Sequence, residues 1–426
     1  MKRRCQPWGV LLCAALLTGL PLAGQAEHVV GIFAPVTGAH APIGRSLRNG
    51  VVLALEQAED GGRFGEVRLS IRTLDDSGAP KAVAERVVKF VRDEMAILVI
   101  GPAISAPAEA AADLANHNRF PLLAPGTSEG ITAKGKWSFR LSMNPYKTLH
   151  ALAAYALTHS PAAEDSAPGV ATPARVPGVR RLALVHAKGN RGYAAQAAEF
   201  RVAAIRAGAV VAGEFEADLE SGLVAQTADA VRHSGADIVF FAMDAEPGAA
   251  LAAALASSAP TQQQPPTAGL LSSILGSTRA SAPDSATPAR RIQFVFSPAA
   301  AHSALTRIGG AAVEGALTAA DYLPEARTER NEQFRAAYRI RFGTDVDAWA
   351  GIGYAAGQVA AEAIRNAGPN PTPETVRLAL ERVNHLQTIL GQSPWQQDVE
   401  RNPTYAPQMY VLRAGRLVPV QTARAK

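Results

Sequence analysis

Short apolar segments typical of buried strands alternate with amphipathic segments typical of helices along this chain, and the alternation occurs twice. In the first half, the apolar segments lie at 28–35, 67–74, 96–100 and 120–123. Apolar residues at helical spacing mark the stretches between them, at 46–59, 81–91 and 106–115. Strands that alternate with helices form a parallel sheet covered by helices on both faces. The first half therefore predicts an α/β lobe.

The same pattern starts again near residue 180 and predicts a second α/β lobe. Its expected strands lie at 182–186, 210–214, 237–242 and 292–296, and its expected helices at 194–207 and 223–233. Further along, we expect helices at 329–341 and 349–366, and a hairpin at 409–420 that turns at Ala414-Gly415. Two segments rich in Pro, Ala and Gly, 160–178 and 259–290, interrupt the pattern as loose inserts. The chain of 426 residues is long enough for two such lobes.

Residues 1–26 have the layout of a secretory signal peptide. Basic residues at 2–4 precede an apolar stretch at 10–20, and the small residues Gly24 and Ala26 stand before the expected cleavage site. The apolar stretch is well short of the ~20 residues that a membrane-spanning helix needs. We therefore expect cleavage near Ala26 and a periplasmic location.

Charge and residue usage exclude several classes of function. The net charge is +5, and removing the three basic residues at 2–4 leaves the rest of the chain near +2. Its Lys and Arg are interleaved with acids, which argues against a nucleic-acid partner. Both cysteines, Cys5 and Cys13, lie in the signal segment, and the nine histidines show no spacing typical of metal ligands. We expect no metal and no cofactor.

Four loops follow strands at the edge where parallel sheets bind ligands, at 35–44, 101–107, 124–130 and 243–247. Ser105 directly precedes the helix expected at 106–115, and Ser128 follows Pro125-Gly126. A helix N-terminus presents free N–H groups that bind carboxylates. The alternative is that each serine only caps its own helix. Asp75-Asp76 precede Ser77-Gly78 and are interpreted as part of a turn.

The residues at 126–130 also have the G-x-S-x-G spacing of a hydrolase nucleophile elbow. Asp244 and His302 follow Ser128 in the chain order of that fold. The elbow needs a long helix directly behind its serine, and the stretch at 131–137 is a poor helix former. We therefore expect no enzyme, and a serine hydrolase using Ser128 is the minor alternative.

Several segments carry residues that occur together in one protein family. They are Val30-Gly31-Ile32, Pro35-Val36-Thr37-Gly38, Gly44, Asn49-Gly50, Leu74 to Ala82, Val99-Ile100-Gly101-Pro102, Phe120 to Pro125, Phe139-Arg140, Gly235 to Phe240 and Phe334 to Phe342. In this order they resemble the type 1 periplasmic binding proteins, specifically the Leu/Ile/Val-binding branch that serves ABC transporters for amino acids and amides. The resemblance covers nearly the whole chain after residue 26 apart from the two inserts.

The resemblance implies two doubly wound parallel-sheet lobes, joined by three crossovers, that close on a ligand like a Venus flytrap. The first lobe would comprise 27–146 and 325–390, and the second 147–324 and 391–426. The implied function is capture of a small molecule (an amino acid, an amide or a related organic acid) by a monomer that delivers it to a membrane permease. A ligand-sensing ectodomain of the same fold is the alternative, because this sequence does not separate transport from sensing.

The resemblance also assigns binding roles in the first lobe. The carboxylate-binding hydroxyls of the family fall on Ser105 and Ser128. A backbone contact falls at Gly126, with Thr127 beside it, and the side chain near the mouth of the first loop falls on Ile43. The resemblance therefore favours a ligand carboxylate at both serines over simple caps.

The second lobe departs from the family pattern. Arg191, with Tyr193 two residues later, and Asp244 stand where amino-acid binders often carry aromatic residues. The acid that usually holds the ligand ammonium would fall near Pro298 or Ala299, and neither can take that role. Asp244 is a carboxylate that can replace it, or it only caps the helix expected near residue 247. Arg191 meets a second ligand acid, pairs with Asp244 or faces solvent, and these three alternatives stay open.

Overall fold

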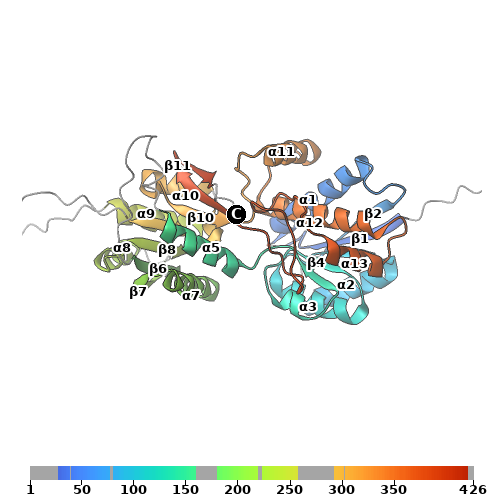
Figure 1. Ribbon diagram of the computed structural model, residues 1–426, viewed down its shortest axis with the longest axis horizontal. Helices are drawn as coiled ribbons and strands as arrows, with labels where there is room; N and C mark the ends of the chain where they lie inside the picture. Colours follow the sequence, from blue (N-terminus) through green and yellow to red (C-terminus); the bar gives the residue numbers. More distant parts are fainter. Residues whose placement is uncertain are drawn as a thin grey trace, which may run out of the picture.

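The computed structural model describes residues 27–38, 40–76, 80–159, 180–218, 223–257, 292–301 and 303–420. They form two lobes that lie side by side, each built around its own sheet (Figure 1). The predictions for the signal peptide at 1–26 and for the inserts at 160–178 and 259–290 lie outside the described residues.

The first lobe contains a parallel sheet with the strand order β2-β1-β3-β4-β5. Its strands are β1 (Glu27–Ala34), β2 (Arg68–Asp75), β3 (Leu98–Ile100), β4 (Leu122–Ala124) and β5 (Ser138–Arg140). The helices that alternate with them are α1 (Ala41–Asp60), α2 (Pro80–Glu94), α3 (Ser105–Asn118) and the short α4 (Gly130–Ala133). The predicted alternation is confirmed, and β5 is an additional strand that the apolar pattern did not indicate.

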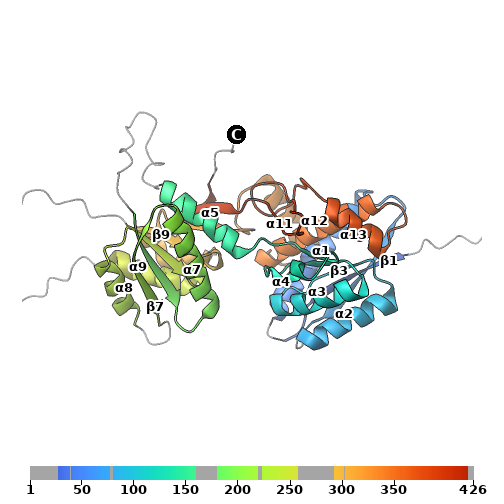
Figure 2. The ribbon, with the colours of Figure 1, turned by 60° about the horizontal axis from the view of Figure 1, so that its bottom comes forward.

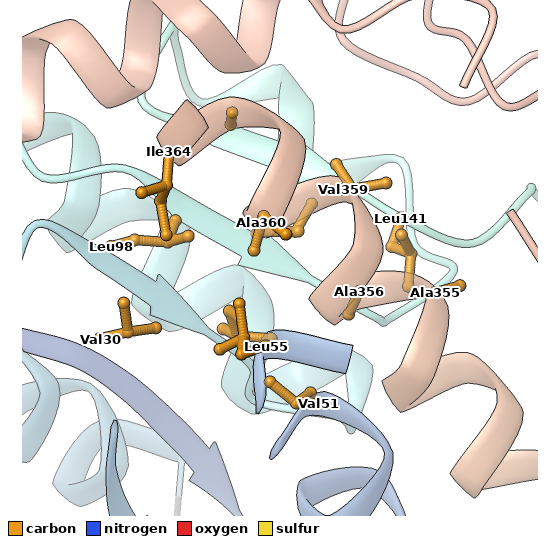
Figure 3. Packing of buried hydrophobic residues seen from close by; sticks show 14 of the residues in the cluster. Val30, Val51, Leu55, Leu98, Leu141, Ala355, Ala356, Val359, Ala360 and Ile364 are labelled. Carbon is orange, nitrogen blue, oxygen red and sulfur yellow. The ribbon is translucent and has the colours of Figure 1, made fainter. Parts of the chain in front are cut away.

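Helices cover both faces of the first sheet (Figure 2). One face packs against α2 and α3, and the other against α1, α12 (Ala348–Ala367) and α13 (Pro373–Arg382). Small residues bring α1 and α12 close together, because a Cβ on Gly50 or Gly353 would lie 2.1 Å from a carbonyl oxygen of the other helix. Figure 3 shows the result, with Val359, Ala360 and Ile364 of α12 in the same cluster as Leu55 and Leu98.

The second lobe contains a mixed sheet with the order β12-β11-β10-β9-β8-β6-β7. Its strands are β6 (Arg181–Ala187), β7 (Val210–Ala217), β8 (Ile238–Ala242), β9 (Gln293–Phe296), β10 (Leu317–Ala320), β11 (Gln408–Arg413) and β12 (Arg416–Pro419). The strands from β6 to β10 are parallel, whereas β11 and β12 are antiparallel. The expected hairpin is confirmed, since Ala414 and Gly415 both have positive φ, at 48° and 72°.

The second sheet is also covered on both faces. One face packs against α5 (Pro145–Thr158) and α7 (Arg191–Arg206). The other face packs against α8 (Val224–His233), α9 (Ala245–Ser257) and α10 (Ser303–Gly309). Within the described residues, no helix is long and apolar enough to cross a membrane.

Three chain crossings connect the lobes, at 141–144, at 321–328 before α11 (Glu329–Phe342), and at 383–407. The third crossing lies along the first lobe for much of its length. Trp395 and Tyr405 are buried in the core beside α12, and the indole Nε1 of Trp395 donates to the Leu141 carbonyl at 3.1 Å. These two residues, which the sequence division placed in the second lobe, therefore pack with the first.

The three crossings meet at one set of hydrogen bonds, formed by Met143, Asp321 and Tyr405 and called here the crossing joint. The Met143 N–H donates to the Tyr405 hydroxyl at 3.1 Å, and the Asp321 carboxylate accepts from both Tyr405 and Met143. Burial raises the pKa of Asp321 to about 6. Each residue of the joint belongs to a different crossing.

Candidate ligand-binding site

The carboxyl ends of the parallel strands in both sheets lie toward the crossings. The first crossing leaves the sheet of the first lobe at the end of β5, and the second leaves the other sheet at the end of β10. Because the neighbouring strands are parallel to these two, their loops emerge at the same edges, toward the middle of the molecule in Figure 1. Loops at the carboxyl ends of parallel strands are where such sheets bind ligands.

The loop after β1 is fixed by Asp75, the last residue of β2. The Asp75 carboxylate accepts from the backbone N–H of Val36 at 3.0 Å and from the hydroxyl of Thr37. Asp75 therefore ends β2 and also holds the loop that follows the neighbouring strand β1. The sequence had indicated only a turn at this residue. Helix α1 begins at Ala41, earlier than expected, so Ile43 lies in its first turn and is half-buried.

Ser128 lies in the loop after β4, and its hydroxyl is engaged within the first lobe. The hydroxyl donates to Glu109 and accepts from the Gly130 N–H at 3.2 Å. The helix behind it, α4, has only four residues and is too short for a nucleophile elbow. The hydrolase alternative therefore lacks its main structural element, and His302 lies outside the described residues.

Glu109 contacts Ser128 in the structure, and the sequence reasoning did not include it. Helix α3 begins at Ser105, with Ile104 at the N-cap position, and Glu109 stands one turn further along the helix. Gly130 allows its close approach, because a Cβ at that position would lie 2.8 Å from the Glu109 carboxyl carbon. A carboxylate therefore stands beside the hydroxyl that was expected to bind a ligand carboxylate.

Arg140, at the end of β5, lies beneath the same loop and is fully buried. Its Nη1 donates to the Thr127 carbonyl at 2.9 Å, whereas Nε and Nη2 have no hydrogen-bond partner among the described residues. Burial lowers the pKa of Arg140, and the charges of Glu129 and Asp398 oppose that effect. Above Arg140, Gly126 is buried and Thr127 is exposed. A guanidinium keeps its charge even when buried, so positive charge lies directly behind the loop.

In the second lobe, α7 and α9 bring Tyr193 and Asp244 together. Asn190 caps α7 by accepting from the Tyr193 N–H at 3.1 Å. The Tyr193 hydroxyl donates to Asp244 Oδ1 at 2.5 Å. Burial raises the pKa of Tyr193, so its hydroxyl stays protonated and remains a donor. Asp244 directly precedes α9, close to where the sequence placed a helix start, and is exposed.

Arg191 is the first residue of α7 and is exposed. It forms no ion pair with any described residue, so the partner of Asp244 in this arrangement is Tyr193. Pro298 and Ala299 lie in a short 3-10 helix after β9 and supply no acid. The second lobe thus presents an exposed guanidinium, and an exposed carboxylate that is held by a phenol.

These groups can bind a charged ligand. The first lobe offers a hydroxyl and loop N–H groups in front of a buried positive charge, and the second offers a carboxylate and a guanidinium. Among the described residues, no group of three or more potential metal ligands comes together. The geometry brings Gly126, Thr127 and Ser128 onto one loop of the first lobe, and Tyr193 and Asp244 into contact on the second.

Two α/β lobes with three crossings and facing carboxyl ends define a two-lobed binding fold. The sequence profile of the periplasmic binding proteins matches residues 28–289 and 280–415, and the chain therefore belongs to that family. Leu/Ile/Val-binding protein homolog 2 of Brucella abortus is 30% identical over 131 residues, 30% of this chain and 34% of the relative. Leu/Ile/Val-binding protein BraC3 of Rhizobium johnstonii is 30% identical over 128 residues, 29% of this chain and 34% of the relative. The match spans about a third of the length of these relatives.

Solved structures share the fold over nearly the whole chain. A putative branched-chain amino acid ABC transporter protein from Rhodospirillum rubrum has a TM-score of 0.74 at 21% identity, covering 93% of this chain and 100% of that one. A solute-binding protein from R. palustris in complex with benzoate has a TM-score of 0.63 at 18% identity, covering 93% and 96%. A substrate-binding protein from Desulfitobacterium hafniense in complex with Leu has a TM-score of 0.65 at 17% identity, covering 93% and 100%. At these identities the likeness establishes the fold.

Proposed function

We propose that this protein is the extracytoplasmic solute-binding component of an ABC importer and captures a small carboxylate-bearing ligand between its lobes. The observation that carries the proposal is the placement of binding groups at the facing carboxyl ends of both sheets, around Ser128 in one lobe and around Asp244 in the other. Membership of the periplasmic binding protein family and the names of the relatives support it.

In this proposal the ligand carboxylate lies against the first lobe. The N–H groups of the loop at 126–128 donate to it, together with Ser105 at the start of α3, and the Ser128 hydroxyl donates to it in place of Glu109. Arg140 stabilises the bound anion from behind, because its charge is buried and a buried charge is poorly screened. The Thr127 carbonyl, which Arg140 holds, fixes the direction of the neighbouring N–H groups.

The second lobe would then select among carboxylates. Asp244 offers a partner for a ligand ammonium, with Tyr193 holding its orientation, and Arg191 offers a partner for a second acid. A ligand that touches both lobes favours their closed arrangement, because only differential affinity shifts such an equilibrium. Amino acids, amides and related organic acids all carry the required groups. Leu and benzoate, the ligands recorded in the names of two structurally similar proteins, fall within this range.

A thermal-shift screen of the purified protein against amino acids, amides, aromatic acids and dicarboxylates tests the proposal. A ligand present at a hundred times its dissociation constant adds about 2.7 kcal/mol to the free energy of unfolding. We expect one class to raise the melting temperature, and this rise to shrink in the Ser128→Ala variant. If every class leaves the melting temperature of the unmodified protein unchanged, the proposed capture of a small carboxylate is wrong.

A further inference from the structure

A cavity of about 490 Å³ opens on the side of the molecule where α11 of the first lobe approaches the β11–β12 hairpin of the second. We call it the lateral pocket. Glu325, Arg327 and Arg335 line it from the second crossing and α11, and Arg416 lines it from the hairpin. Ser128, Arg191 and Asp244, which the structure describes, are not among its lining residues, so it is separate from the candidate ligand site.

The lateral pocket concentrates positive charge that the protein does not neutralise. The guanidinium groups of Arg327, Arg335 and Arg416 form no hydrogen bond and no ion pair with any described residue, and Glu325 is the acid beside them. Two other arginines on α11 have ion-pair partners within the protein. Arg339, one turn after Arg335, pairs with Asp345, and Arg341 pairs with Glu56 at 2.9 Å. The guanidinium of Arg335, which lines the pocket, is therefore available for a partner from solution.

The hairpin also supplies an apolar part of the wall. Leu417, Val418 and Pro419 line the pocket along β12, and Val418 is exposed there. Gly415 of the hairpin turn and Ser303 and Thr306 of α10 complete the lining. Three guanidinium groups and one carboxylate give the pocket a formal excess of two positive charges. The apolar surface beside them is stabilised when an apolar group covers it. This combination matches a molecule that has a doubly negative head group and an apolar body.

We propose that the lateral pocket is a binding site for a small organic dianion, such as a phosphate monoester with an apolar body. Planar guanidinium groups bind phosphate and carboxylate oxygens in pairs, which gives them both affinity and orientation. The head group lies among Arg327, Arg335 and Arg416, and the body lies on Leu417 and Pro419.

The position of the lateral pocket gives its occupant a second effect. Arg335 is carried by α11, whose buried residues Phe334 and Tyr338 belong to the core of the first lobe. Arg416 is carried by the hairpin of the second lobe. A dianion that contacts both therefore links the lobes outside the candidate ligand site. Movement of one lobe against the other changes its contacts, so the two sites are coupled, and the coupling is equal in both directions.

Isothermal titration calorimetry with phenyl phosphate as the probe tests the site. We expect saturable binding of phenyl phosphate, binding at least tenfold weaker for inorganic phosphate, which lacks the apolar body, and none for benzyl alcohol, which lacks the charge. The variants Arg335→Ala and Arg416→Ala should each weaken phenyl phosphate binding at least tenfold. Raising the salt concentration should also weaken it, because the pocket is open to solvent.

Arg339→Ala is the matched control, because it removes the same charge from the same helix one turn away and outside the lateral pocket. It should change the affinity for phenyl phosphate less than twofold. The proposal is overturned if the unmodified protein does not bind phenyl phosphate, or if Arg339→Ala weakens binding as much as Arg335→Ala. It is also overturned if Asp244→Asn abolishes binding while Arg416→Ala preserves it. That last result would place the probe between the lobes and leave the proposed function intact.

Discussion

The two lobes share one architecture but present different side chains at their carboxyl ends. In the first lobe the binding loop is held from within, by buried Arg140 under Thr127 and by Glu109 beside Ser128. In the second lobe, Arg191 and Asp244 are exposed, and the Tyr193 hydroxyl holds Asp244. A preorganised loop suits a group that every ligand carries, whereas exposed charges suit the part by which ligands differ. In the proposed function, the first lobe would therefore anchor the ligand and the second would discriminate among ligands.

The largest effect should come from removing the charge behind the anchor. Arg140→Met keeps an unbranched side chain in the buried site but removes the positive charge and the bond to the Thr127 carbonyl. We expect the affinity for the ligand found in the screen to fall about 100-fold, about 3 kcal/mol, near the upper end for a charged hydrogen bond. Titration calorimetry measures it. The melting temperature should change little, since two buried unpartnered nitrogens are lost as well. Retained affinity would show that Arg140 serves the fold alone.

A smaller effect that depends on the ligand should come from the second lobe. Asp244→Asn keeps an acceptor for the Tyr193 hydroxyl but removes the charge that an ammonium would meet. We expect ligands with an amine to lose about 30-fold in affinity, about 2 kcal/mol, and simple acids to lose none. Titration of an amino acid and of its deaminated analogue measures the difference. An equal loss for both would contradict the division of roles between the lobes.

Ser128 and Glu109 should respond in opposite directions. Ser128→Ala removes a donor from the loop, and we expect about tenfold weaker binding of carboxylates, about 1.5 kcal/mol. Glu109→Gln removes the negative charge that competes for the Ser128 hydroxyl, so carboxylates should bind severalfold more tightly. Calorimetry with one carboxylate ligand compares the two variants. If Glu109→Gln weakens binding instead, then Glu109 helps to hold the loop in its binding shape.

The smallest effect concerns stability and belongs to the edge of the first lobe. Asp76 is buried, its Oδ2 has no partner among the described residues, and burial, helped by Asp75, raises its pKa to about 6. The folded state therefore binds this proton more tightly than the unfolded chain, whose carboxyl has a pKa near 3.9. Its contribution to stability is present below pH ~4 and is lost as the pH rises through about 6.

Asp76→Asn should accordingly stabilise the protein by about 1 kcal/mol at pH 7.5 and by less at pH 5. Urea unfolding at the two pH values measures the difference. Asp321 shows the same sign of pKa shift, so the unmodified protein and the variant should share a residual pH dependence. A variant that is less stable than the unmodified protein at pH 7.5 would mean that the Asp76 charge is stabilising.

Much of the fold could be predicted because local patterns decide it. The buried strands β1, β3, β4, β6 and β8 are apolar runs, and the hairpin turn is fixed by Ala414-Gly415. The strand β5 could not be predicted in this way, since its polar residues Ser138 and Arg140 are fully buried and break the apolar signal. The cost of burying such polar side chains falls when they form hydrogen bonds with other segments of the chain, as Arg140 does with the Thr127 carbonyl.

The candidate site was less predictable than the fold. The loops were found because strand ends mark them, but the contact between Glu109 and Ser128 joins residues 19 apart, and the contact between Tyr193 and Asp244 joins residues 51 apart. Such pairings depend on how helices pack, which periodicity does not specify. The sequence therefore located Ser128 and Asp244 without revealing which group each one contacts. Their roles toward a ligand, like those of Ser105, Ile43 and Arg191, stay predictions.

The crossing joint limits how the lobes can move. Three separate crossings would bend independently, and the lobes would then have several axes of rotation available. Here the Tyr405 hydroxyl and the Asp321 carboxylate fasten the three crossings at one place. We therefore expect a rotation of one lobe against the other to be centred near these hydrogen bonds. Such a rotation would change the separation between the loops that carry Ser128 and Asp244.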